Sequence, residues 1–100
     1  MAILERTLTG DFTTILTELD AVVKQSVSAT LEGSSDFNFS TGRCAVRVYE
    51  RYSAIGNSRV TMSLTLLEAD GQIRLSAITS CGGTVISAMA TVMAARVEYL

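Results

Sequence analysis

Residues 44–52 read CAVRVYERY, and residues 60–67, which read VTMSLTLL, follow after a short polar break. Every second residue in these stretches is apolar, namely Cys44, Val46, Val48, Val60, Met62, Leu64 and Leu66. A period of two is typical of a strand with one buried face and one face in water. We therefore predict that the two stretches form the centre of an antiparallel sheet, with these apolar side chains in the core. Their polar neighbours, among them Arg47 and Arg51, are expected on the opposite, open face.

Three more segments alternate in the same way and are predicted strands: residues 3–9, 26–32 and 73–79. The pair Asp70-Gly71 precedes the last segment, and Asp-Gly between alternating runs is a strong hairpin signal. Before the central strand, Gly33-Ser34-Ser35-Asp36 has the composition of a turn. Residues 37–40, FNFS, are expected to form a short strand or an extended approach to the central strand.

Two helices are predicted from apolar residues spaced three and four apart. The first runs from Asp11, whose carboxylate caps the first turn, to about Gln25. The second begins at Thr84, which can cap it, and ends near Glu98. The side of this helix away from its apolar stripe is small rather than charged. We therefore predict that it is either largely buried or in contact with another copy of the chain.

The order of these elements is β-α-β-β-β-β-α, which predicts a single α+β domain over residues 1–100. Its expected architecture is a mainly antiparallel five-stranded sheet with two helices packed on one face. The crossover through the first helix predicts that the first two strands run parallel. The sequence leaves open whether those two strands are neighbours in the sheet.

Composition and charge limit the partners and the cellular location that we expect for this protein. The net charge is −2 and the isoelectric point is near 4.9, which argues against nucleic acid or an anionic membrane as a partner. The N-terminus lacks the features of a signal peptide, and no apolar run reaches the roughly 20 residues of a membrane span. We expect a cytoplasmic, bacterial-type protein with reduced thiols.

The chain contains no histidine, which removes the commonest general base and the commonest transition-metal ligand. Its acidic residues are scattered, without the spacing of a calcium loop or of a catalytic carboxylate pair. We therefore expect no metal site, no cofactor and no catalytic residue that can be named.

Four motifs in the middle half of the chain carry a resemblance to a known family. They are Ser35-Asp36-Phe37, CAVRVYERYS at residues 44–53, Asn57-Ser58-Arg59-Val60, and SAITS at residues 76–80 with Gly82-Gly83 after it. With these motifs the chain resembles a family of small uncharacterised bacterial domains, found mainly in Firmicutes. The resemblance implies no activity, cofactor or catalytic residue. The C-terminal stretch, rich in Ala and Met, departs from the more aromatic and acidic ending of that family.

Four side chains are candidates for a small anionic ligand on the open face. Arg47, Tyr49 and Arg51 project from the same side of the central strand, and Arg74 is expected to join them from the last strand. Such a face can also stack single-stranded bases, but the acidic composition makes nucleic acid an unlikely partner. The alternative is a solvated face whose arginines pair across strands.

A second candidate is the loop Cys81-Gly82-Gly83, just before the last helix. The helix dipole would favour a thiolate at Cys81, and the backbone amides of the glycines would suit a phosphate or carboxylate. No histidine is available as its base. The alternative is a loop cysteine followed by two glycines that allow a sharp turn.

Two functions follow from these features. The first is a non-enzymatic binding or assembly module that forms a homo-oligomer through its sheet edges and through the last helix. The helix residues expected in this contact are Ala88, Met89, Met93, Ala94 and Ala95. The second is a domain that binds a small anionic ligand, with weak cysteine-based chemistry at the Cys81-Gly82-Gly83 loop.

Overall fold

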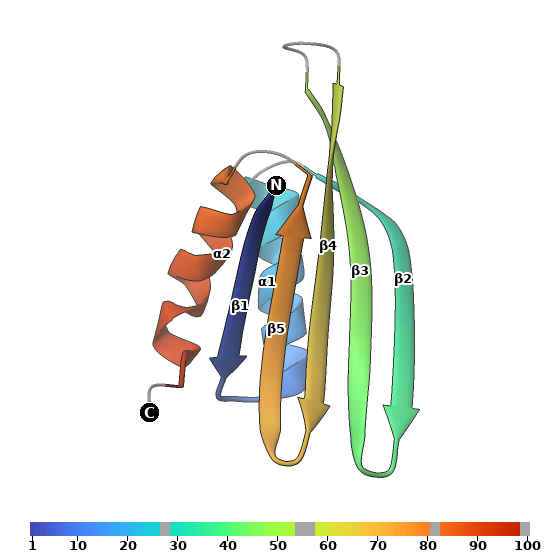
Figure 1. The fold of residues 1–100 in the computed structure, drawn as a ribbon, viewed down its shortest axis with the longest axis vertical. Helices are drawn as coiled ribbons and strands as arrows, with labels where there is room; N and C mark the ends of the chain where they lie inside the picture. Colours follow the sequence, from blue (N-terminus) through green and yellow to red (C-terminus); the bar gives the residue numbers. More distant parts are fainter. Residues whose placement is uncertain (27–28, 54–57, 81–82, 99–100) are drawn as a thin grey trace.

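The computed structural model describes residues 1–26, 29–53, 58–80 and 83–98 (Figure 1). In chain order its elements are β1 (Ala2–Leu8), α1 (Phe12–Ser26), β2 (Thr30–Phe39), β3 (Gly42–Ser53), β4 (Ser58–Ala69), β5 (Gln72–Thr79) and α2 (Thr84–Met93), followed by a 3-10 turn, η1 (Ala94–Arg96). The five strands form one antiparallel sheet in the order β1-β5-β4-β3-β2. The predicted α+β class and element order are therefore confirmed.

Both helices pack on one face of the sheet and leave the other face open (Figure 1). The buried strand residues identify the helix side: Leu4 and Leu8 in β1, Ala45 and Tyr49 in β3, Met62, Leu64 and Leu66 in β4, and Ile73, Leu75, Ala77 and Thr79 in β5. Consecutive strand residues point to opposite faces. Their neighbours in sequence therefore lie on the open face of the sheet.

The first two strands lie at opposite edges of the sheet. Each step from β1 to β2 is antiparallel, so the two strands run in the same direction, as predicted from the helical crossover. They are not neighbours, because β5 returns to pair with β1.

The predicted boundaries around β2 were wrong. Residues 33–36 form no turn; they lie within a strand that runs from Thr30 to Phe39 and pairs with β3. The register shifts between Leu31 and Gly33, which marks a β-bulge at Glu32. Backbone pairing along β3 outweighs the turn preference of Gly, Ser and Asp in this segment.

The predicted buried face of β3 was also wrong. Ala45 and Tyr49, each 1% exposed, face the helices, whereas Cys44, Val46 and Val48 lie partly exposed on the open face. The register with β4 sets this choice, because it places Tyr49 opposite the buried Met62. For β4 itself, the predicted burial of Met62, Leu64 and Leu66 is confirmed.

The helix ends differ in how well they were predicted. The Thr14 amide donates a 3.0 Å hydrogen bond to Asp11 Oδ2, which confirms the predicted cap of α1. In contrast, Gly83 occupies the N-cap position of α2, with no side-chain cap bond, and Thr84 is the first helical residue. The helix ends at Met93, short of the predicted Glu98, because η1 turns the chain back toward β1.

The side chains of Met89 and Met93 lie in the core of their own chain, with 0% exposure. They face α1 and the sheet, which explains why α2 needs so little charge. These two residues therefore do not form the surface that we expected to contact another copy.

Candidate functional site

The residues predicted to bind an anion are divided between the two faces of the sheet. Arg47, Tyr49 and Arg51 alternate with the open-face residues of β3 and therefore lie on the helix side. Arg74 lies on the open face, as predicted, because it alternates with the buried Ile73 and Leu75. The structure does not bring the four side chains together.

The Tyr49 side chain is part of the core rather than of a ligand site. Its hydroxyl donates a 2.6 Å hydrogen bond to Asp20 Oδ1 on α1. Burial, followed by the neighbouring Asp20, raises the pKa of Tyr49. Burial alone would raise the pKa of Asp20, but the hydrogen bonds from Tyr49 and Lys24 outweigh it and leave that pKa below its ordinary value.

Arg47 has partners within its own chain. Its Nη1 lies 3.1 Å from Asp36 Oδ1 on β2 and donates a 3.0 Å hydrogen bond to the carbonyl of Val46. The Arg47 side chain is only 16% exposed. This is the cross-strand pairing that we considered as the alternative to a ligand site.

The candidate loop before α2 falls largely outside the described residues. Cys81 and Gly82 lie in the part that the structure does not describe, so their predicted role stays a prediction. Gly83 is exposed, and its carbonyl accepts a 2.8 Å hydrogen bond from the Ser87 amide as α2 begins.

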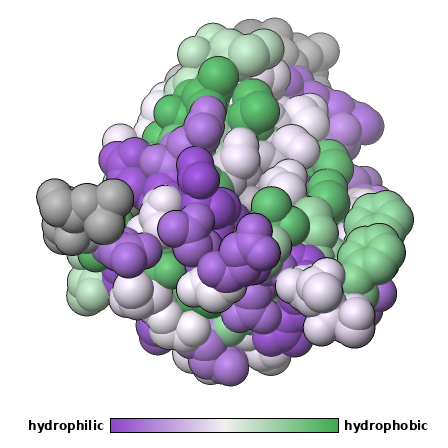
Figure 2. Space-filling model, turned by 60° about the horizontal axis from the view of Figure 1, so that its bottom comes forward, coloured by the Kyte–Doolittle hydropathy of each residue, from purple (hydrophilic) through white to green (hydrophobic). Residues whose placement is uncertain are grey.

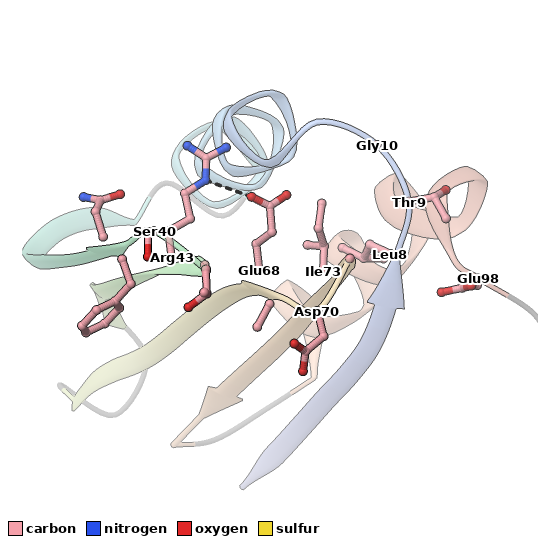
Figure 3. Close-up of a pocket in the computed structure, with 15 residues that line it drawn as sticks. Leu8, Thr9, Gly10, Ser40, Arg43, Glu68, Asp70, Ile73 and Glu98 are labelled. Carbon is pink, nitrogen blue, oxygen red and sulfur yellow. Dashed lines mark hydrogen bonds and ion pairs between the residues drawn. The ribbon is translucent and has the colours of Figure 1, made fainter.

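A cleft of about 610 Å³ lies where the β1–α1 connection, the β2–β3 turn and the β4–β5 turn come together (Figure 3). One wall is the ion pair between Arg43 Nε and Glu68 Oε1, at 3.2 Å, and both side chains point toward α1. The Arg43 guanidinium also covers the Phe12 ring, 4.2 Å from its centre.

The cleft does not suit an anion. Glu68 neutralises Arg43, and the other charged side chains that line the cleft, Asp70 and Glu98, are both acidic. Hydrophilic side chains gather over this end of the molecule (Figure 2). Among the residues that the structure describes, no group of cysteine, aspartate and glutamate side chains could hold a metal ion.

The open face carries a set of large exposed apolar side chains, which we call the open-face apolar set. Its members are Ile3, Phe37, Phe39, Tyr52, Leu67 and Ile78. Phe39 is the most exposed of them, at 73%. Hydrophobic side chains are prominent on the side of the molecule where β2 lies (Figure 2).

Strand pairing arranges members of this set in two groups. Phe37 pairs with Cys44, and Cys44 pairs with Leu67, so three neighbouring strands form a continuous apolar row. Ile3 and Ile78 form a second group through β1 and β5. The two phenylalanines were not predicted as a surface feature, although the alternation Phe37-Asn38-Phe39 is typical of a strand with one apolar face.

The fold is that of an α+β domain, with an antiparallel sheet, two helices on one face of it and large exposed apolar side chains on the other face. Residues 1–97 match the sequence model of the family described as "Family of unknown function (DUF6054)", and the chain belongs to this family. The match includes the helix that we expected to depart from the family pattern. No curated protein and no solved structure matches the chain.

Within residues 1–26, 29–53, 58–80 and 83–98, no helix has both the length and the apolar character needed to cross a bilayer.

Proposed function

We propose that this protein is a non-enzymatic assembly module that packs its open sheet face against the open face of a second copy. The observation that carries this proposal is that most of the large exposed apolar side chains lie on this one face of the sheet. A two-layer fold normally buries such side chains beneath another layer. A second sheet at a spacing of about 10 Å would supply that layer.

The area of the face supports a contact of the necessary size. With strands about 4.8 Å apart and a rise of about 3.4 Å per residue, the five strands give a face of roughly 800 Å². Two such faces bury about 1,600 Å², which is the standard size of specific protein interfaces and below the roughly 2,000 Å² and more of obligate ones. The contact is therefore expected to be reversible rather than obligate.

The chemistry of the face suits a second copy. Hydroxyl groups of Ser63, Thr65 and Ser76 lie between the two apolar groups, as in interfaces that are not permanent. Glu5 and Arg74 give the face charges of both signs, so two copies do not meet as surfaces of one sign.

The anionic-ligand alternative has less support. Arg47 and Tyr49 already have partners in the chain, and Arg74 lies on the other face of the sheet. The acidic lining of the cleft adds nothing to an anion site.

A matched pair of substitutions tests the proposed face. Leu67 on the open face and Val92 on α2 are almost equally exposed, at 42% and 43%. We expect Leu67→Glu to halve the subunit number measured by native mass spectrometry, because it buries a charge in the contact. Val92→Glu is expected to leave the subunit number unchanged. If both variants keep the wild-type subunit number while circular dichroism shows native folds, the proposed face is wrong.

A further inference from the structure

The two edge strands of the sheet, β1 and β2, differ in whether another segment of the chain covers them. At β1, the Thr9 amide donates a 2.7 Å hydrogen bond to the Arg96 carbonyl, and the Glu98 amide donates a 2.9 Å bond to the Thr7 carbonyl. Leu8 also bridges Val97 in the same segment. The segment after α2 therefore covers one end of the β1 edge.

The β2 edge has no such cover among the residues that the structure describes. All ten residues of β2 are exposed, and β3 is its neighbour in the sheet. An edge strand presents outward amides and carbonyls that can pair with another strand. Natural edges are commonly protected by lysine or proline, and β2 contains neither.

The regular part of β2 lies beyond its bulge. From Gly33 to Phe39, each residue pairs with successive residues of β3, from Val48 to Gly42. The acidic residues are already engaged within the chain. Asp36 pairs with Arg47 at 3.1 Å, and Glu32, at the bulge, accepts a 2.6 Å hydrogen bond from the Thr30 hydroxyl. The segment from Gly33 to Phe39 is thus a regularly paired edge whose one charged residue, Asp36, has a partner in the chain.

We propose that β2 pairs antiparallel with β2 of a second copy, so that the two sheets become one continuous sheet. The sequence of the edge is self-complementary when Ser35 lies on the two-fold axis. In that register Gly33 lies opposite Phe37 of the other copy, and an aromatic ring across from an edge glycine covers its exposed backbone. Ser34 lies opposite Asp36, where a hydroxyl can donate to a carboxylate.

The neighbouring registers explain why this one is preferred. A shift of the axis to Asp36 places two carboxylates directly opposite each other, which is destabilising. A shift of the pairing by a single residue puts the helix side of one copy beside the open face of the other. The register about Ser35 keeps both pairs of helices on one side of the sheet.

Edge pairing and face packing use surfaces at right angles, so neither contact excludes the other. The edge contact does not depend on the proposed face contact. Together they predict an assembly of four chains, in which two edge-paired sheets pack face to face. Either contact alone predicts a dimer.

Disulfide trapping tests the edge contact directly. In a background of Cys44→Ser and Cys81→Ser, we expect Ser35→Cys to form a disulfide across the two-fold axis and to double the covalent mass on mild oxidation. Thr30→Cys is the matched control, because it lies on the same exposed strand but far from its own copy in this register. Equal cross-linking of the two variants, or none by either, would overturn the proposed pairing.

Combining this variant with Leu67→Glu separates the two proposals. If Leu67→Glu halves the subunit number and the Ser35→Cys cross-link still forms, both contacts are supported. Cross-linking with an unchanged subunit number supports the edge and rejects the face. A Leu67→Glu monomer without cross-linking supports the face and rejects the edge. A wild-type monomer that forms no cross-link rejects both, and an extended peptide of another protein then becomes the candidate occupant.

Discussion

The hydroxyl of Tyr49 donates a 2.6 Å hydrogen bond to the carboxylate of Asp20, and this contact joins β3 to α1. Tyr49 was predicted to lie on the open face of β3, and this contact shows that it lies on the helix side instead. The ring of Tyr49 fills the core, while its polar end finds a charged acceptor at the margin of that core. A residue that looked like part of a ligand site is therefore a structural one.

Removing this hydroxyl tests that structural role. We expect Tyr49→Phe to lower the free energy of unfolding by about 1.5–3 kcal/mol, because a hydrogen bond to a charged acceptor is lost. Tyr52→Phe is the control, since Tyr52 is 61% exposed. Urea titration followed by circular dichroism measures both variants. Equal stability of the two would show that the Asp20 contact contributes nothing.

Alkaline pH should weaken the fold through the same residue. The folded-state pKa of Tyr49 lies above its ordinary value of 10.0, chiefly because of burial. Its contribution is therefore fully present below pH 10 and declines as the pH rises toward the folded-state pKa. We expect the urea midpoint to fall above about pH 10. The fall should be smaller in Tyr49→Phe, and an identical fall would assign the effect to other groups.

Acid pH should lower the stability of the fold through a different pair of residues, Glu18 and Arg96. Arg96 donates hydrogen bonds of 3.0 and 2.9 Å to the two carboxylate oxygens of Glu18, and these bonds lower the pKa of Glu18 below its ordinary value of 4.5. A lowered folded-state pKa means that this contribution is present above pH 4.5 and is lost as the pH falls through the folded-state value.

Substitution of the arginine isolates this acid effect. We expect Arg96→Met to show a smaller loss of thermal stability between neutral and acid pH than the wild type. Arg6→Met is the control, because Arg6 is exposed and donates to the carbonyl of its neighbour Glu5. An acid dependence in Arg96→Met that matches the wild type would contradict the role of this pair.

A charge at Met89 should unfold the chain rather than separate subunits. Met89 is 0% exposed, so Met89→Asp buries a carboxylate in the core of its own chain. The expected loss is at least about 3 kcal/mol, similar to severe core substitutions. Val92→Asp, on the exposed side of the same helix, should stay folded. A folded Met89→Asp monomer would instead restore α2 as an assembly surface.

Much of the fold could be predicted from the sequence. Period-two patterns and the Asp70-Gly71 turn identified the last strands, and Asp11 with the apolar spacing after it identified α1. These are local properties: a cap, a turn and a period each depend on residues close in the chain. The candidate site was predicted less well, because it depends on which face of a strand meets which element.

The sequence by itself determined the element order, the α+β class and the absence of histidine chemistry. Only the tertiary structure decided that Tyr49 lies inside and Cys44 outside, and that β2 continues through Gly33 to Phe39. The physical reason is that β3 carries apolar residues on both faces, so periodicity gives the alternation without giving its direction. That direction follows from long-range pairing with β4 and from the acceptor that Asp20 provides, neither of which is visible in a local stretch of sequence.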